Sequence, residues 1–246
     1  MSALGASPSP QKVCLIIPCF NEEGGLGELG ARLLAILDEA LGLEVTLVDN
    51  GSQDGSRALI HELSQKHPRI KAVFLSQNSG YGNGIKQGLK SVDAGCVGWT
   101  HADLQTDPRD FLVAMGLFGP SGKDFVKGIR KGRPWLDSVF SRGMEIWAGA
   151  IFGRRLRDIN GQPTLVGPEM KAILEDGPDD FSFDLYALVM AKKLGLRELR
   201  FPTMFGERYS GRSSWNTSAL ARLGLVKRTV GYSLRLRREV ATRDNH

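Results

Sequence analysis

The sequence predicts an α/β fold in which a mostly parallel central sheet is flanked by helices. In the first hundred or so residues, short apolar runs alternate with segments of helical periodicity in the order β-α-β-α-β-α-β. The strands are separated by about 15 to 25 residues, enough for the helical crossover that parallel neighbours need. The 246 residues include 41% hydrophobic and 24% charged ones, which is ordinary for a globular chain and excludes a disordered or fibrous one.

The early strands are expected where β-branched residues gather in short apolar runs, as in strands buried on both faces. The helices between them carry apolar residues at helical spacing, for example Leu29, Leu33 and Leu37, and are expected to end at Gly42 and before Pro68. The expected order is strand 13–18, helix 26–41, strand 44–49, helix 54–66, strand 70–75, helix 82–92 and a fourth strand ending ahead of His101.

The second half of the chain has a looser pattern, with no linker that would indicate a second independent domain. We expect strands at 124–129 and 197–201, helices at 135–152 and 181–194, and a basic amphipathic helix at 217–238. The predicted organisation is a flexible N-terminus (1–11), one folded domain (12–215) and a basic helical extension (216–246).

The composition indicates where in the cell the protein is expected and which partners it could bind. The sequence has no run of ~20 apolar residues, no signal-peptide core, and three cysteines without metal-ligand spacing, so a cytoplasmic protein is expected. The net charge of +5 is uneven, because residues 197–243 hold eleven Lys or Arg against three Glu, a balance of +8. This basic end could meet phosphates, nucleic acid or an anionic membrane, or simply be a solvated face, and charge alone leaves these open.

Polar clusters follow the first, second and fourth expected strands. They are Asn21-Glu22-Glu23, Asp49-Asn50-Gly51-Ser52 and His101-Ala102-Asp103. Ligands of parallel α/β sheets bind at the carboxyl ends of the strands, so we expect the three clusters to line one crevice.

Asp49 is a candidate ligand for a nucleotide. A carboxylate at the tip of a buried strand, held by the following Asn-Gly-Ser turn, can accept hydrogen bonds from a nucleobase or ribose. The alternative for this segment is capping of the next helix, which we favour for Asp54 but not for Asp49.

His101 and Asp103 are candidate metal ligands. They are two residues apart at a strand end and so share one side of the chain, where an imidazole and a carboxylate could converge on a divalent cation and its diphosphate. Magnesium or manganese suits a carboxylate with phosphate oxygens, and the imidazole favours manganese. A polar loop residue satisfied by the backbone is the open alternative for His101.

The glycine-rich segment 78–86, which contains Gly80, leads into a helix. Its spacing is not that of a P-loop, so it is weak evidence for phosphate binding by itself. Close approach of a sugar or nucleotide and a plain turn at the start of a helix are equally good interpretations.

The motifs as an ordered set resemble the family 2 glycosyltransferases with the Rossmann-like glycosyltransferase A-type fold, most of all the dolichyl- and polyprenyl-phosphate sugar transferases. The set comprises IIPCFNEE, LVDNGSQDGS, NSGYGNGIKQGL, HADLQTDP, VKGIRKGRPW, the expected helix that contains Ser141 and Arg142, RDINGQPTLV, FSFDLYALVMAKKLGL and RYSGRSSW. It covers the chain to about residue 215, which the resemblance makes the catalytic domain.

The resemblance implies roles for particular residues. It puts the nucleotide-sugar against Pro18, Asn21, Glu22, Asp49, Gly51, Gly80, Asp103 and Gln105, the divalent metal against Asp103 and His101, and the acceptor near Arg208, Arg212, Ser213 and Asp158. It also implies transfer of a sugar from a nucleoside diphosphate with inversion, assisted by Mn²⁺ or Mg²⁺, with Asp103 and Asp158 as the catalytic carboxylates.

Three positions depart from the family pattern. His101 stands where the family commonly has Asp, Tyr186 replaces a Glu, and Ser214 replaces a Lys. We expect Arg212 to supply the missing cation, because an arginine can hold a phosphate bidentately. The alternative for Arg208 and Arg212 is that they are solvent-exposed loop residues.

A base is needed only if the acceptor is a sugar hydroxyl, because a lipid phosphate is already anionic. Our first candidate is Asp158, and Asp179, Asp180 and Asp184 are the others.

The sequence therefore predicts a metal-assisted, inverting glycosyltransferase that acts on a polyprenyl phosphate or a cell-surface glycan. A non-catalytic nucleotide-sugar-binding protein with a decayed site is the alternative, and nucleic-acid binding is not expected, since no recognised motif is present. Contact with the cytoplasmic face of the membrane is expected through helix 217–238 if the acceptor is a lipid; packing of that helix on the domain or on a second subunit is the competing interpretation.

Overall fold

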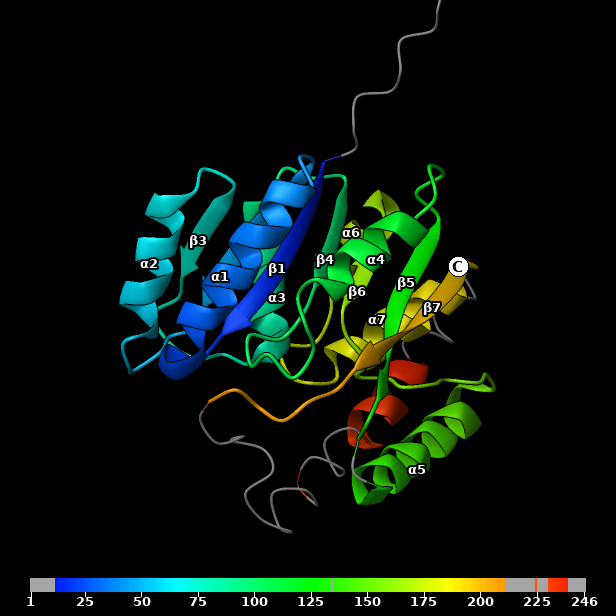
Figure 1. The fold of residues 1–246 in the computed structure, drawn as a ribbon. Coiled ribbons are helices and arrows are strands. Elements are labelled where there is room, and N and C mark those ends of the chain that lie inside the picture. Colours follow the sequence, from blue (N-terminus) through cyan, green and yellow to red (C-terminus); the bar gives the residue numbers. More distant parts are fainter. Residues whose placement is uncertain (1–11, 134, 211–223, 225–229, 239–246) are drawn as a thin grey trace, which may run out of the picture.

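The computed structural model describes residues 12–133, 135–210, 224 and 230–238. It has an α/β fold with a seven-stranded sheet covered by helices on both faces, which confirms the predicted fold class (Figure 1). The elements are β1 Val13–Cys19, α1 Glu23–Glu39, β2 Leu43–Asp49, α2 Ser56–Lys66, β3 Ile70–Phe74, α3 Tyr81–Ser91, β4 Cys96–Trp99, α4 Asp110–Leu117, β5 Asp124–Lys131, α5 Trp135–Phe152, β6 Thr164–Val166, α6 Pro168–Leu174, α7 Phe183–Lys193 and β7 Arg197–Met204.

The sheet has the order β3-β2-β1-β4-β6-β5-β7. All neighbouring pairs are parallel except those of β6, which runs antiparallel to both β4 and β5. The sequence predicted the first four strands together with β5 and β7, but not the short strand β6 or the helices α4 and α6. β6 has only three residues, too few to show a period of their own.

The strand register sets the position of the polar clusters. Cys19, the last residue of β1, pairs with Asp49, the last residue of β2, so the loops that follow start at the same edge. On the other side of β1, Ile16 pairs with Trp99 at the end of β4. The expected meeting of three carboxyl ends is therefore what the sheet produces.

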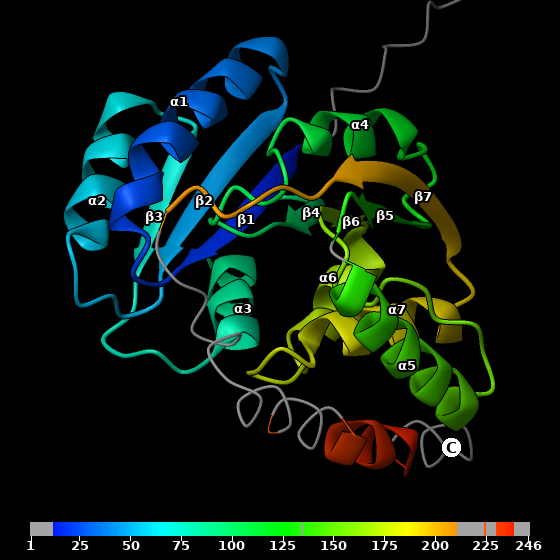
Figure 2. The same cartoon turned by 60° about the horizontal axis from the view of Figure 1, so that its bottom comes forward.

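Two helical layers bury the two faces of the sheet. Leu15, Ile17 and Leu47 face α1, α2 and α4, whereas Ile16 and Val48 face α3, α6 and α7 (Figure 2). Successive residues of β1 point to opposite faces, and all of them except the half-buried Pro18 are buried, which is why this strand is a continuous apolar run.

A buried polar network crosses the core between β4, β5, β6 and α7. Asp184 accepts hydrogen bonds from Trp99 Nε1 (2.9 Å) and Gln162 Nε2 (2.8 Å), and Lys127 Nζ donates to Thr164 Oγ1 (3.1 Å) and lies 3.9 Å from Asp184 Oδ1. Lys127 and Asp184 are fully buried. Burial lowers the pKa of Lys127 to about 8 despite the opposing effect of Asp184.

The described residues include part of the expected C-terminal helix. Residues 230–238 are helical, while most of the expected helix 217–238, the expected flexible segment 1–11 and the residues Arg212 and Ser213 lie outside the described residues. None of the described helices has both the length and the apolar character needed to span a bilayer.

Candidate active site

The candidate site lies at the carboxyl ends of β1, β2 and β4, where the segment after β7 crosses this edge (Figure 1). It brings together residues from four distant parts of the sequence: Asn21 and Glu22, Asp49 and Gly51, Asp103 and Gln105, and Arg208. Pro18, half-buried in β1, pairs with Val48 just before these loops.

Asp49 is the buried anchor of the turn after β2. Its Oδ1 accepts the N–H of Ser52 (3.0 Å) and its Oδ2 accepts Arg57 Nη1 (3.2 Å), while the side chain is fully buried. The Arg57 guanidinium also lies 4.8 Å above the Phe74 ring centroid. Sequence reasoning did not identify Arg57, which occupies one face of the carboxylate that we expected to meet a nucleoside.

Gly51 and Asn21 join this turn to its neighbours. Gly51 has φ 74°, and a Cβ there would lie 2.5 Å from the backbone carbon of Gln77, so only glycine fits. Asn21, with φ 55°, accepts the N–H of Gln53 on its Oδ1 (2.8 Å) and donates its own N–H to Ser52 Oγ (3.1 Å). The loops after β1 and β2 thus form one hydrogen-bonded unit.

Asp54 has the structural role that we favoured. Its carboxylate accepts the N–H of Ser56 (3.0 Å) at the start of α2 and that of Glu23 (3.2 Å) at the start of α1. Burial raises the pKa of Asp54, but hydrogen bonds from the side chain and the backbone of Ser56 and from the backbone of Glu23 outweigh it, so the net pKa is lowered.

Arg208 bridges two of the expected site carboxylates. Its Nη2 forms an ion pair with Glu22 Oε1, and its Nη1 lies 3.7 Å from Asp103 Oδ2. Burial raises the pKa of Glu22, Arg208 opposes this and the charge of Asp103 adds to it, so the net pKa is above the ordinary value. Two carboxylates thus share one guanidinium, and the cluster keeps a negative charge when both are ionised.

The segment 205–209 is held on the loop after β4 by hydrogen bonds from backbone and side-chain donors. Gly206 donates its N–H to the Gln105 carbonyl (2.8 Å), Gln105 Nε2 donates to the Gly206 carbonyl (3.3 Å), and the N–H of Tyr209 reaches the Asp103 carbonyl (3.3 Å). Asp103 Oδ1 accepts the N–H of Gln105 (3.1 Å), which closes its own loop. These contacts place Arg208 beside Asp103.

His101 contacts an aromatic stack. Its ring lies 5.0 Å from that of Tyr81, which in turn stacks on Phe181 at 4.9 Å. Tyr81 accepts a hydrogen bond from Gln162 Nε2 (3.2 Å), and its burial raises its pKa well above the ordinary value. Sequence reasoning missed Tyr81, which lay inside the glycine-rich segment.

Gly80 is fixed by packing. Its φ is 107°, and a Cβ there would lie 2.3 Å from the Asp179 carbonyl oxygen. Asn50 Nδ2 donates to the Gly80 carbonyl (2.9 Å), and Asn50 Oδ1 is buried without a partner among the described residues. The close approach at Gly80 is therefore to backbone, which favours the interpretation of this segment as the start of a helix.

Asp158 lies apart from the Arg208 cluster, in a tight pair with Arg130. Its Oδ2 accepts the Arg130 N–H (2.7 Å), its Oδ1 accepts Arg130 Nε (2.9 Å), and its own N–H donates to Glu145 Oε1 (2.7 Å). Burial raises the pKa of Asp158, but Arg130 outweighs it and the net pKa is lowered. Arg130 also lies 5.5 Å from the ring centroid of Phe205, next to the segment that holds Arg208.

The carboxylates of the other candidate bases differ in how far they are exposed to solvent. Asp184 is fully buried in the polar network, Asp179 pairs with Lys86 Nζ (2.6 Å), and Asp180 accepts the N–H of Ser182 (2.9 Å). Of these carboxylates only Asp179 has a largely exposed side chain, at 62%.

The metal-ligand set is small. In the described part of the chain, no group of three His, Cys, Asp or Glu side chains could hold a metal by itself. Asp103 is a partly exposed carboxylate beside Glu22, and this suits a cation that arrives with a diphosphate and takes most of its ligands from phosphate and water. The residues therefore fit a metal–nucleotide pair better than a resident metal.

Comparison with known proteins identifies the family. The model of the glycosyl transferase family 2 matches residues 14–176, more than half of the chain and the whole of the loops after β1, β2 and β4. The chain belongs to glycosyl transferase family 2.

Curated relatives of this family 2 glycosyltransferase include an undecaprenyl-phosphate 4-deoxy-4-formamido-L-arabinose transferase from Edwardsiella ictaluri. It is 26% identical over 217 residues, which cover 87% of this chain and 66% of the relative. The chain therefore spans just under two thirds of that protein's length.

Solved structures confirm the glycosyltransferase A-type fold. Glucosyl-3-phosphoglycerate synthase from Mycobacterium tuberculosis, solved with Mn²⁺, UDP-glucose and phosphoglyceric acid, matches with a TM-score of 0.70 at 18% identity over 93% of this chain and 80% of that one. A mannosyltransferase from Pyrobaculum calidifontis, solved with GDP-mannose and Mn²⁺, matches with a TM-score of 0.59 at 20% identity over 82% of this chain and 58% of that one.

Proposed function

We propose that this glycosyltransferase transfers a sugar, with inversion, from a nucleoside-diphosphate sugar to a polyprenyl phosphate, assisted by Mn²⁺ or Mg²⁺. The observation that carries the proposal is the Glu22–Arg208–Asp103 cluster at the carboxyl ends of β1 and β4. Family membership supports the reaction class, the relative named for undecaprenyl phosphate supports the acceptor, and the two structures named with Mn²⁺ support the metal.

The donor is assigned to the unit formed by the loops after β1, β2 and β4. We assign the nucleoside to the surface of Pro18, Asn21 and the Asp49–Ser52 turn, which hydrogen bonds between the loops make rigid. Because Asp49 already holds Ser52 and Arg57, its contact with the nucleoside requires Arg57 to give way or to share the carboxylate. Rigidity here lowers the entropic cost of ordering the donor.

The diphosphate is assigned to Asp103, Gln105 and His101. A divalent cation held there by Asp103, with His101 as the second expected ligand, would neutralise charge on the departing nucleoside diphosphate. Arg208 separates the two carboxylates of Glu22 and Asp103 and moderates their repulsion before the donor binds.

The acceptor phosphate is assigned to Arg208, with Arg212 and Ser213 as its expected partners. Arg208 has five N–H donors, and its Nε already donates to the Ser210 carbonyl (2.9 Å), which orients the guanidinium. The other N–H donors belong to Nη1 and Nη2, which face Asp103 and Glu22, and those that the two carboxylates leave free can contact a phosphate. A lipid phosphate so held is an anionic nucleophile and requires no protein base to lose a proton.

For Asp158 we propose a positioning role in place of the base role expected from the sequence. Both of its oxygens accept N–H groups of Arg130, and its pKa is lowered, so it is a weak proton acceptor. Arg130 in turn contacts Phe205 of the 205–209 segment. Asp158→Asn should therefore reduce turnover by disturbing Arg130 and should not introduce a new pH dependence.

The test of the proposed function is calorimetric binding of UDP and of GDP, each with and without Mn²⁺. We expect one nucleotide to bind tightly only with the metal, and Asp103→Ala to weaken this binding at least a hundredfold, whereas the exposed Asp93→Ala should leave it unchanged. Sugar transfer from the corresponding donor to a polyprenyl phosphate then tests the acceptor. Absence of binding for both nucleotides would favour the decayed-site alternative.

A further inference from the structure

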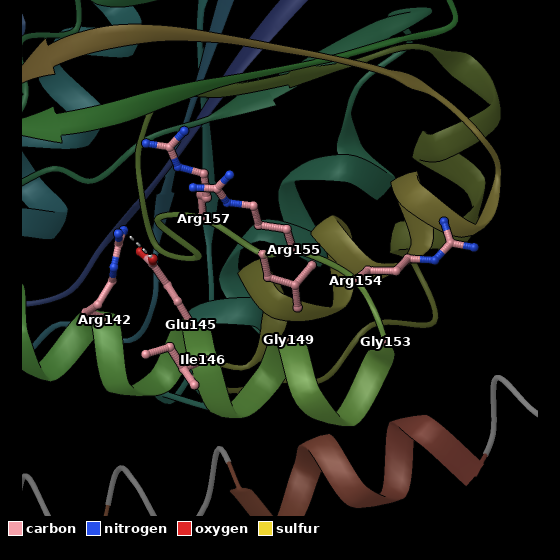
Figure 3. A pocket seen from close by; sticks show the side chains of 9 residues that line it. Arg142, Glu145, Ile146, Gly149, Gly153, Arg154, Arg155 and Arg157 are labelled. Carbon is pink, nitrogen blue, oxygen red and sulfur yellow. Dashed lines mark ion pairs between the residues drawn. The ribbon is translucent and has the colours of Figure 1, made fainter.

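A second concentration of positive charge surrounds a pocket of about 550 Å³ between α5 and the segment that follows it. We call it the arginine pocket; it is lined by Arg142, Glu145, Ile146 and Gly149 of α5 and by residues 153–157 (Figure 3). It has no residue in common with the proposed donor site.

The backbone geometry of the pocket follows from its glycines. Gly153 has φ 60°, a left-handed conformation that ends α5 and turns the chain back, and the N–H of Arg154 then donates to the Gly149 carbonyl (3.1 Å). A Cβ on Gly149 would lie 3.1 Å from the Arg154 carbonyl oxygen, so the close approach favours glycine. Leu156 is buried and fixes the returning segment on the core.

The pocket contains four arginines and one acidic side chain. Glu145 is already engaged, because its Oε1 accepts the N–H of Asp158 (2.7 Å) and its Oε2 lies 3.5 Å from Arg142 Nη1. Arg154 Nη1 donates to the Lys192 carbonyl (2.7 Å). Because this carbonyl is neutral, it does not compensate the positive charge of Arg154. The positive charge of the pocket is therefore largely uncompensated by its own lining.

Arg155 and Arg157 are the free cations of this set. Within the described residues, neither side chain has an ion pair or hydrogen bond, although the backbone carbonyl of Arg157 is fixed by Arg200 Nη1 (2.5 Å). In Figure 3, Arg142, Arg155 and Arg157 rise toward the same side of the pocket, and Arg154 points away. Guanidinium groups gathered around one hollow repel one another, and a bound anion relieves that repulsion.

We propose that the arginine pocket binds a phosphorylated ligand at a site separate from the proposed donor site. The planar N–H pairs of arginine match the oxygens of a phosphate, and several of them can hold a diphosphate or a phosphomonoester. The phosphate can belong to a soluble metabolite or to a lipid headgroup, since the recognition chemistry is the same. The proposal goes beyond the proposed function and does not depend on it.

The first arm of the test measures binding of inorganic diphosphate to the full chain in EDTA, which removes any metal-dependent binding at the donor site. We expect saturable binding that R155Q/R157Q weakens at least tenfold. The control K90Q/K123Q removes two exposed charges elsewhere and should leave binding unchanged. All three proteins are compared at one ionic strength, and their unfolding curves verify that they fold alike.

The second arm identifies the source of the phosphate. If it is a lipid headgroup, the wild type should float with phosphatidylglycerol vesicles but not with phosphatidylcholine vesicles, and R155Q/R157Q should lose this binding while K90Q/K123Q keeps it. Pocket-dependent binding of diphosphate alone indicates a soluble ligand.

Absence of binding in both arms, or equal losses in the two double variants, overturns the proposal. Metal-dependent nucleotide binding should persist in R155Q/R157Q, so this result is independent of the donor site.

Discussion

Three residues other than glycine have a positive φ in the described part of the chain: Asn21 at 55°, Leu104 at 58° and Asp158 at 41°. Each lies in a loop of the proposed donor or acceptor site. Such conformations cost about 1–3 kcal/mol and persist only where the surroundings fix them. Hydrogen bonds from Gln53 to Asn21 and from Arg130 to Asp158 provide that support. The strain is therefore concentrated where the proposed chemistry needs fixed groups.

Gly51 offers a direct test of this rigidity. Gly51→Ala should destabilise the protein by about 1–3 kcal/mol and weaken nucleotide binding, because φ is 74° and a Cβ would meet the Gln77 backbone at 2.5 Å. Gly27→Ala in α1 is the matched control, since a Cβ there has no neighbour within 4 Å, and it should stabilise by about 0.5–1 kcal/mol. Urea unfolding of both variants measures the difference; equal effects would contradict the prediction.

At the scale of elements, the segment after β7 completes the site. It crosses the ends of the parallel strands and joins the loop after β4 through the N–H of Gly206 and the carbonyl of Gln105 (2.8 Å). This hydrogen bond and that of Tyr209 hold the segment where Arg208 contacts Glu22 and Asp103. An extended segment with few apolar residues is thus held in place by backbone hydrogen bonds.

Removal of the Gly206 donor should separate the segment from the loop. Gly206→Pro has no N–H to donate and should lower transfer activity at least tenfold, whereas Gly206→Ala keeps the N–H, and its Cβ would lie 3.9 Å from the Gln105 carbonyl oxygen. Activity is compared at saturating donor. Similar activities of the two variants would show that this hydrogen bond does not position Arg208.

The buried polar network makes stability depend on pH. Burial lowers the pKa of Lys127 from its ordinary 10.5 to about 8, so between these values the folded chain binds fewer protons than the unfolded chain. Raising the pH from about 8 to 10.5 should therefore stabilise the fold through this residue. The cost of a buried ammonium is present below pH 8 and is relieved as Lys127 loses its proton.

Lys127→Met should remove this contribution. We expect the free energy of unfolding of the wild type, relative to that of the variant, to increase by an amount on the order of a few kcal/mol as the pH rises from 8 to 10.5. The exposed Lys123→Met is the control and should keep the pH dependence of the wild type. Guanidinium unfolding across this pH range gives the comparison, and parallel curves for wild type and Lys127→Met would refute the buried-charge explanation.

At the scale of the whole molecule, the parallel sheet collects loops that are far apart in the sequence, and a ligand bound between them should stabilise the entire fold. UDP or GDP with Mn²⁺, at about one hundred times the dissociation constant, should stabilise the fold by about 2.7 kcal/mol and raise Tm by about 5–10 °C. Mn²⁺ alone should give little shift, because no three-ligand cluster exists among the described residues.

Metal removal provides the complementary measurement. EDTA should abolish the nucleotide-dependent rise in Tm of the wild type. Asp103→Asn should abolish this rise even at Mn²⁺ concentrations at which the wild type shows it. A nucleotide-dependent rise that survives EDTA would show that protein contacts alone hold the diphosphate and would remove the metal from the proposed site.

The sequence by itself determined the fold class and the edge of the sheet at which the candidate site lies. Apolar runs such as 13–18 and helical periodicity between them specify a parallel sheet, and such a sheet places residues that follow its strands at one edge. Asn21, Asp49 and Asp103 were therefore predictable as neighbours. The capping role of Asp54 was predictable as well, since it depends on residues close in sequence and on the start of a helix.

Only the tertiary structure decided which groups pair across the site. The Arg208 contacts with Glu22 and Asp103, the Asp158–Arg130 pair and the buried Lys127 all join residues from separate elements, and no periodicity or spacing records such pairings. These pairings set charge, pKa and access, which is why Asp158 changes from an expected base to a proposed positioning residue. Local sequence patterns specify elements because their hydrogen bonds and periodicity are local, whereas long-range electrostatics depends on the assembled fold.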